Sequence, residues 1–308
     1  MTIDTSTAFY DVMFDTNKVQ QPMNILEEKA LEQVRTVLNE PGHLKKHIPT
    51  LPAMLIKLLE TLKNPYSDVF DFVDILEKDP AFAAEVLRVA NSARYCKADQ
   101  EIRSLKRAVS LLGLSGLSKI ATTLLMASVI PCKPMYYKMF GRQIWVHSMH
   151  CAILCELLAG SHDEDEFDAY FIGLIHDMGK IVVFNCLCEA LGMVMIDCSP
   201  GTKIFKQLMS ETSTELSAYI AKEWQLPKIY CEALAQQSIN QQSTIKEAVT
   251  PLAKLLNQAN TLSEAYLMQV KGMVTDDELD QLFTLFSFHS SAWQQFSELA
   301  VEIDTSVN

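Results

Sequence analysis

The chain has 308 residues, of which 49% are hydrophobic, and its formal net charge is −12 at neutral pH. This length suits one large domain or two closely packed lobes, and the apolar content is enough for a substantial core. The acidic balance leaves no basic field that would attract phosphate backbones, so non-specific nucleic-acid binding is not expected.

The N-terminal sequence lacks the basic region and the apolar core of a signal peptide. The longest apolar stretch, residues 120–132, is shorter than a bilayer span. The eight cysteines do not follow a zinc-finger spacing, and most lie in apolar helical stretches, as buried thiols do in a reducing compartment. We therefore expect a cytoplasmic protein with no membrane partner.

Helical periodicity runs through the chain, and no strand-like alternation interrupts it. Residues 1–23 show no sustained period and predict an irregular arm. Residues 24–39 predict one amphipathic helix, which Pro41-Gly42 then breaks. Because one amphipathic helix cannot bury its own face, residues 1–47 are interpreted as an N-terminal extension with one helix.

Helix-start signals become dense in residues 48–132. Ser67 is a candidate N-cap for a helix through residue 78, Asp79 precedes Pro80 in a second start signal, and Ser104 is a third candidate cap. Gly113 separates the last two predicted helices of this segment. The prolines that follow predict a lobe boundary near residue 132.

The second half predicts longer helices. Residues 136–160 predict one long helix, after which Asp168 is a candidate cap for residues 169–178, with Gly179 as the residue just past its end. Further helices are predicted at residues 181–195, 213–224, 228–238 and 245–260, followed by a capping box at residues 275–278 and a last helix from residue 291.

Three ionisable residues lie on these helices at a spacing that suggests a metal site. His147 precedes the adjacent pair His176 and Asp177 by an interval that accommodates a helix, a turn and a second helix returning antiparallel. Side chains on facing helices hold metals in this way. The alternative is that His147 is an ordinary core histidine and that Asp177 caps or bridges local structure.

The surrounding residues resemble a known family. Residues 174–180 (Leu-Ile-His-Asp-Met-Gly-Lys), together with residues 145–148, look like the HD superfamily and specifically its HDOD branch. Residues 79–92 and 102–113 are similar to the N-terminal signatures of that branch, and residues 224–227 resemble its Trp-Gly-Leu-Pro turn.

This resemblance implies an all-α, two-lobed helical HDOD fold. Its N-terminal lobe would comprise residues 48–132, its C-terminal lobe at residues 133–260 would resemble the HD phosphohydrolase core, and the helices of residues 261–308 would pack on the body. The resemblance also implies a role in bacterial signal transduction.

The chain departs from the catalytic members of the superfamily at several positions. Where those relatives have a further histidine, this chain has Ser213, and where they have a later His pair it has Gln237 and Ser238. Asn260 stands approximately where the late aspartate is found. Hydroxyl and neutral amide oxygens are weak ligands for a divalent cation, so a two-metal hydrolytic site is not expected.

The sequence thus predicts a non-catalytic regulatory module that acts by protein or small-ligand binding. No cofactor is expected, and one weakly bound divalent metal on His147, His176 and Asp177 is the open alternative. If the protein were active, the same three residues would be catalytic in a metal-dependent phosphohydrolase or phosphodiesterase acting on a nucleotide.

Two other groups of residues were weighed. His147, Cys151 and Cys155 recur every four residues on one helix face, which permits zinc ligation but is more typical of a core stripe. A second group concentrates positive charge and amide donors in the N-terminal lobe and could form a site for a signalling protein or a small phosphorylated ligand, the default alternative being a solvated helix face. Its members are Arg88, Asn91, Arg94, Arg103, Lys106 and Arg107.

Overall fold

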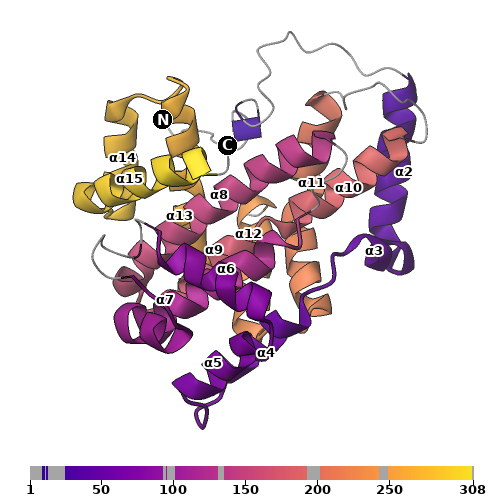
Figure 1. Cartoon of the computed structure of the whole chain (residues 1–308). Helices are drawn as coiled ribbons and strands as arrows, with labels where there is room; N and C mark the ends of the chain where they lie inside the picture. Colours follow the sequence, from indigo (N-terminus) through magenta and orange to yellow (C-terminus); the bar gives the residue numbers. More distant parts are fainter. Residues whose placement is uncertain are drawn as a thin grey trace. The chain divides into compact units, whose positions relative to one another are not determined.

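The computed structural model describes residues 9–10, 12, 25–92, 95, 101–130, 135–192, 202–242 and 249–306. Within these residues every regular element is a helix, which confirms the predicted all-α class. The chain divides into two compact units, Thr50–Ile130 and a second unit made of Met1–Pro49 and Pro131–Asn308 (Figure 1). The N-terminal extension and the C-terminal helices therefore belong to the same unit as the HD-like segment.

In the part of the Thr50–Ile130 unit that the structure describes, four helices contact one another in succession. They are α4 (Ala53–Lys63), α5 (Val69–Glu77), α6 (Pro80–Ala90) and α7 (Leu105–Ala127). Asp79 and Ser104 are the N-caps of α6 and α7, as predicted. The N-cap of α5 is Asp68 and not Ser67, because Asp68 forms a reciprocal capping box with Asp71.

Gly113 separates two helical segments within α7, as the sequence indicated. Its φ of 71° is left-handed, so α7 has a kink at this residue, and the helical segments before and after Gly113 follow one another directly. Glycine adopts this conformation without a steric penalty, which explains why the break occurs at this residue.

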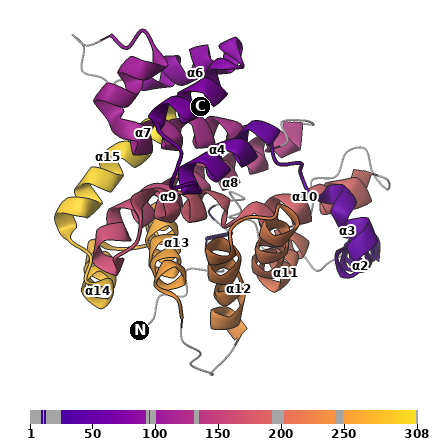
Figure 2. The same cartoon turned by 90° about the horizontal axis from the view of Figure 1, so that it is seen from below.

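The larger unit is a helical bundle that carries most of the buried core. Figure 2 shows α11, α12 and α13 side by side, with α8 and α9, which pack together, above them in the view. Its elements are α2 (Ile25–Asn39), α3 (Pro41–His47), α8 (Met135–Ala159), η1 (Gly160–His162), α9 (Glu166–Ile175), α10 (Met178–Gly192), α11 (Thr202–Glu223), α12 (Lys228–Gln242), α13 (Pro251–Val270), α14 (Asp276–Phe286) and α15 (Ser290–Ser306).

Three local expectations in this unit were wrong. The helix predicted at residues 24–39 does end before Pro41, at Asn39, but the extension has a further helix beside the single one expected: Pro41 begins α3, since proline at the first helical position lacks only an amide that would be unpaired anyway. Asp165 caps α9 in place of Asp168, whose carboxylate instead accepts a 2.7 Å hydrogen bond from Tyr230. Gly179 lies inside the first turn of α10 and is not a helix terminator.

Gly179 has a packing role instead. A Cβ atom at this position would lie 1.9 Å from the Ser213 carbonyl oxygen of α11, far inside van der Waals contact. The Gly179 amide also donates a 2.9 Å hydrogen bond to the Ser217 hydroxyl of the same helix. The absence of a side chain therefore lets the start of α10 lie directly against the backbone of α11.

A tryptophan just after α11 joins that helix to the end of the Met1–Pro49 segment. The Trp224 indole donates a 2.8 Å hydrogen bond to the Pro49 carbonyl. Gln225, which replaces the glycine of the family's Trp-Gly-Leu-Pro turn, has a left-handed φ of 56°. This conformation explains why a glycine suits that position, and here glutamine bears the associated strain.

Three helical stretches are long and apolar enough to cross a membrane when judged by length and composition alone. The sequence had indicated no apolar stretch longer than residues 120–132. The three stretches are Leu105–Ala127, Gly141–His162 and Glu166–Leu187. In the second and third stretches, 72% and 94% of the apolar window is buried inside the protein, so these side chains form part of the hydrophobic core.

Candidate functional site

Two helices and the turn after them bring His147, His176 and Asp177 together in the larger unit. His147 lies in the middle of α8, His176 caps the C-terminal end of α9, and Asp177 follows it before α10 begins. One ligand atom from each residue lies within 4.8 Å of the other two, and all three side chains are buried. The structure thus brings together the three residues that the sequence grouped.

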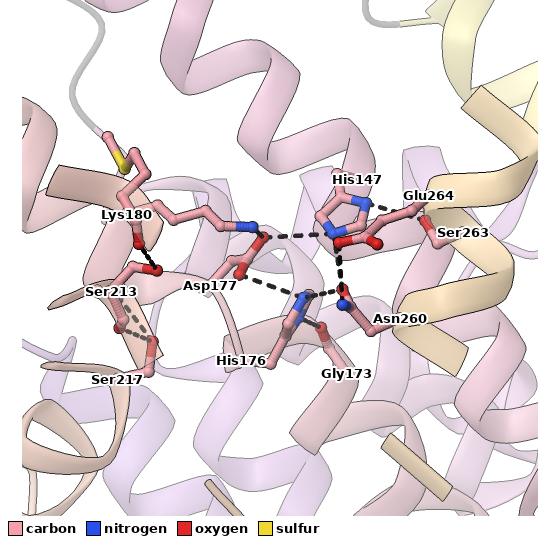
Figure 3. A network of polar contacts seen from close by, with 12 residues as sticks. His147, Gly173, His176, Asp177, Lys180, Ser213, Ser217, Asn260, Ser263 and Glu264 are labelled. Carbon is pink, nitrogen blue, oxygen red and sulfur yellow. Dashed lines mark hydrogen bonds and ion pairs between the residues drawn. The ribbon is translucent and has the colours of Figure 1, made fainter. Parts of the chain in front are cut away.

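Helix α13 contributes a fourth polar group, Asn260, to this cluster (Figure 3). Its amide oxygen lies 3.0 Å from His147 Nε2 and 3.1 Å from His176 Nε2. The amide nitrogen of Asn260 donates to a Glu264 carboxylate oxygen at 3.1 Å, which fixes the orientation of the amide. Both imidazoles are therefore turned onto one neutral oxygen.

His176 is surrounded by acceptors. Its Nδ1 lies 2.7 Å from the Gly173 carbonyl oxygen, and its Nε2 faces Asn260 and also Asp177 Oδ1 at 3.3 Å. Burial lowers the pKa of His176, but the Asp177 carboxylate and the contact with Cys151 outweigh that effect and raise the pKa to about 9. The ring therefore carries a proton on each nitrogen at neutral pH.

His147 is neutral in the same cluster. Burial lowers its pKa well below the ordinary value, which the attraction of Asp177 does not offset. Its Nε2 faces Asn260 and Asp177 Oδ2, the latter at 3.3 Å, while its Nδ1 lies 2.9 Å from the Ser263 hydroxyl. This arrangement assigns the proton to Nε2 and makes Nδ1 the acceptor of the Ser263 hydrogen bond.

Lys180 was missed by the sequence reasoning although it lies three residues after Asp177, within reach on one helical turn. Its ammonium donates a 2.7 Å hydrogen bond to Asp177 Oδ2, and both side chains are almost fully buried. Burial alone would lower the pKa of Lys180, but Asp177 holds it above its ordinary value. The pKa of Asp177 is lowered because His176 and Lys180 together outweigh the effect of burial. The chain itself thus supplies a cation to this carboxylate.

Two aromatic residues of the N-terminal segment also reach the site. The Phe9 ring lies 4.6 Å from the His147 ring, centroid to centroid, and Lys180 Nζ lies 5.0 Å from the Phe9 centroid and 5.5 Å from that of Tyr10. The irregular period of residues 1–23 gave no signal for either contact.

Comparison with protein-family models identifies the family of this chain. A family model described as the HDOD domain matches residues 48–239. The chain belongs to the HDOD family. The match covers the whole Thr50–Ile130 unit and the helices that carry His147, His176 and Asp177.

Individual relatives are distant. The HDOD chain is 24% identical over 187 residues to an uncharacterized protein of Treponema pallidum (strain Nichols), which covers 59% of this chain but only 36% of that protein. The chain therefore spans about a third of the length of this curated relative.

Solved structures share the fold. A candidate phosphohydrolase from Shewanella amazonensis SB2B is 20% identical with a TM-score of 0.62, over 88% of this chain and all of its own. A candidate signal transduction protein from Marinobacter aquaeolei VT8 is also 20% identical, with a TM-score of 0.56 over 98% of this chain and 65% of its own.

The departures from the catalytic HD pattern can be placed in the HDOD structure. Ser213 is buried on α11, where its hydroxyl donates a 2.6 Å hydrogen bond to the Met209 carbonyl. Gln237 is buried on α12, and the side chain of Ser238 lies outside the described residues. Asn260 lies in the cluster itself, although the sequence placed it only approximately.

These residues do not fit a two-metal hydrolytic centre. Two imidazoles and one carboxylate converge, but the fourth group, Asn260, is a neutral amide, and the carboxylate already binds Lys180. A bridged metal pair requires several charged ligands to generate hydroxide near neutral pH. A single metal on His147, His176 and Asp177 would first have to displace the protons from both Nε2 atoms.

The cysteine stripe of α8 belongs to the core. Cys151 and Cys155 are fully buried, and Cys151 also contacts His176. Burial raises the pKa of Cys151 well above the ordinary thiol value, so this residue is a thiol and not a thiolate ligand.

The proposed ligand residues of the Thr50–Ile130 unit have partners within the chain. Arg88 pairs with Glu85 at 2.6 Å, and Arg103 pairs with Glu101 at 2.5 Å. The Asn91 amide donates to the Leu87 and Ile102 carbonyls and accepts from the Ile102 amide, so it closes the loop after α6.

The remaining cations of this group lie at or near α7. Lys106 Nζ is 5.7 Å from the Phe70 ring centroid, and Arg107 lies in the first turn of the helix. Arg94 lies outside the described residues. A role of these six residues in ligand binding stays a prediction.

Proposed function

We propose that this HDOD chain is a non-catalytic regulatory module of bacterial signal transduction, which acts by binding a signalling protein or a small phosphorylated ligand. The observation that carries the proposal is the buried ion pair between Lys180 and Asp177, at 2.7 Å, inside the cluster where catalytic relatives bind metal. The cytoplasmic location and the lack of membrane and non-specific nucleic-acid partners, inferred from composition, are part of the same proposal.

The chemistry of the cluster supports binding over hydrolysis. A metal-dependent phosphohydrolase needs a metal-bound hydroxide, and the positive charge that would create it must be held by charged ligands. Here the positive charges of Lys180 and the protonated His176 already offset the negative charge of Asp177. The Asn260 oxygen accepts hydrogen bonds from both imidazoles. The polar groups of the cluster already have partners within the chain, which disfavours a hydrolytic metal site and favours a binding module.

Elemental analysis tests the proposal. The protein would be purified without chelators, and Mn, Fe, Ni and Zn would be measured beside the His176→Ala variant. We expect far less than stoichiometric metal in both proteins, together with no turnover of bis(p-nitrophenyl) phosphate above that of the variant. Stoichiometric metal that is lost in His176→Ala, with turnover lost in parallel, would refute the non-catalytic function.

The alternative is a metal-dependent phosphohydrolase or phosphodiesterase that acts on a nucleotide. The convergence of His147, His176 and Asp177 within 4.8 Å favours it, as does the likeness to the candidate phosphohydrolase of Shewanella amazonensis. On this reading, saturation with Mn²⁺ or Co²⁺ would produce hydrolysis of a nucleotide phosphodiester that Asp177→Asn abolishes. If the added metal leaves the protein inactive, this alternative fails.

A further inference from the structure

An aromatic pair from the N-terminal segment covers the HD cluster. Phe9 is 1% exposed and Tyr10 is 6% exposed, although they precede the first long helix of the chain. Phe9 lies against the imidazole of His147, and both rings lie close to the Lys180 ammonium. Figure 1 shows the short indigo turn that contains them, remote in sequence from α8.

The Tyr10 hydroxyl lies among the polar groups of the cluster. It is hydrogen-bonded to the side chain of Ser213 and interacts electrostatically with Lys180, Asp177 and Glu264. Tyr10 is thus in contact with the position at which catalytic relatives have a further histidine. The aromatic pair occupies the space next to the ligand atoms that an external ligand of the cluster would need.

The cost of removing this pair is smaller than its apolar area suggests. Phe9 and Tyr10 lie against the Lys180 ammonium and the His147 imidazole, and Tyr10 also interacts with the Asp177 carboxylate; such groups recover hydration when water reaches them. Phe296, in contrast, packs against the rings of Tyr266 and Trp293 and would expose mainly apolar surface on leaving. Withdrawal of the N-terminal pair is therefore the less costly opening of this unit.

We propose that Phe9 and Tyr10 form a tethered plug, and that the cluster of His147, His176, Asp177 and Lys180 receives an external ligand only when this plug withdraws. The plug is an internal occupant of the site and competes with any ligand that approaches from the same side. Its regulatory meaning rests on the proposed binding function, whereas closure of the site can be measured independently.

Chemical modification of histidine tests the closure. Diethyl pyrocarbonate acylates accessible neutral imidazoles, and His147 and His150 lie close enough in sequence to be quantified in one peptide by tandem mass spectrometry. The full chain would be compared with Phe9→Lys, in which a second cation repels Lys180. We expect acylation of His147 to become about tenfold faster in the variant, while His150, which is covered by other rings, keeps its rate.

The matched control is Phe9→Leu, which keeps an apolar side chain of similar volume and should leave the rate for His147 within about twofold of the native protein. Circular dichroism would verify that each variant is folded. An unchanged His147 rate in folded Phe9→Lys would overturn the plug, and so would a rise at His150 equal to that at His147, because the pair would then be ordinary core.

Hydrogen exchange provides a second measurement if Phe9→Lys does not fold. In the native protein, amides of the peptide containing Phe9 and Tyr10 should exchange at least about tenfold faster than those of α8. Equal protection of the two peptides would overturn the proposal. Metal analysis tests the proposed function separately, because stoichiometric metal that is lost in His176→Ala would refute that function and would leave the closure of the site by Phe9 and Tyr10 untouched.

Discussion

Two histidines on α8, His147 and His150, are fully buried and lie one helical turn apart, yet their surroundings are opposite. His147 takes part in a polar network with Asn260, Ser263 and Asp177. Each of its ring nitrogens has a hydrogen-bonding partner, so the side chain is fixed in one tautomer and one orientation.

His150 lies in an aromatic box. The rings of Tyr266 and Phe296 meet it edge-on, with centroids at 5.3 and 5.7 Å. Its Nε2 is 3.3 Å from an Asp304 carboxylate oxygen, but neither ring nitrogen makes a hydrogen bond to any residue that the structure describes. The comparison shows that later helices decide the chemistry of a buried histidine: α13 supplies polar groups to His147, whereas α13 and α15 supply rings to His150.

Among the changes that would disrupt the polar cluster around His147, Gly179→Ala should have the largest effect. The added methyl would enter the backbone of α11, so α10 and the adjoining Asp177 would have to move. We expect a loss of about 5 kcal/mol or more in the free energy of unfolding, measured by urea denaturation. Gly160→Ala is the control, because a Cβ there meets no atom within 4 Å. Equal stability of the two variants would contradict the observed helix contact.

Removal of the internal cation should have the next largest effect. Lys180→Met leaves the buried Asp177 carboxylate without its closest partner, and we expect a loss of about 3 to 5 kcal/mol. Lys228→Met is the matched control, since the Lys228–Glu232 pair is exposed and screened by solvent, so its removal should change stability far less than removal of Lys180. A Lys180→Met protein as stable as the control would show that the pair does not hold the cluster together.

Substitution of each histidine by leucine compares the two centres directly. His147→Leu leaves the buried Ser263 hydroxyl without its acceptor and removes one of the two imidazoles that face the Asn260 oxygen, so we expect a loss of about 2 kcal/mol. His150→Leu removes a ring that has no hydrogen bond to a described residue, and its loss should stay below about 1 kcal/mol. Thermal denaturation measures both, and the reverse order would refute the contrast.

The sequence predicted the site as far as local pattern and family resemblance reach. His147, His176 and Asp177 converge as expected, because two helices joined by a turn return the chain antiparallel. Lys180 was detectable from its spacing to Asp177. Phe9 was not, because its partners are distant in sequence and its own segment has no periodic pattern.

The mistakes in the fold came from signals that several residues can satisfy. Asp165 and Asp168 both suit the cap of α9, and only the buried hydroxyl of Tyr230 decides that Asp168 is used elsewhere. Gly179 fits the sequence pattern of a helix end, but its role depends on the distance between α10 and α11, which no local pattern contains.

A negative charge at position 260 should strengthen metal binding by the polar cluster around His147. Asn260→Asp places a second carboxylate beside the two imidazoles, and we expect the dissociation constant for Co²⁺ to fall about tenfold in calorimetric titration. Asn257→Asp, on an exposed part of the same helix, is the control for added charge. If both variants bind Co²⁺ like the native protein, ligand charge is not what limits metal binding in this cluster.

The smallest expected effect concerns the ionisation of Tyr266, one of the rings of the aromatic box around His150. Burial and, to a smaller extent, the neighbouring Asp304 carboxylate together raise the pKa of Tyr266 to about 12. Because the folded state favours the neutral phenol, this group leaves stability unchanged below pH 10 and reduces it as the pH rises above that value, where the unfolded chain ionises first.

Asp304→Asn removes the repelling charge and should lower the pKa of Tyr266 by a fraction of a unit, detected as an earlier rise of tyrosinate absorbance in an alkaline titration. Tyr266→Phe identifies which part of the absorbance belongs to this residue. A titration that Asp304→Asn leaves unchanged would assign the raised pKa to burial alone. The box around His150 would then be closed by its rings, without an electrostatic contribution from α15.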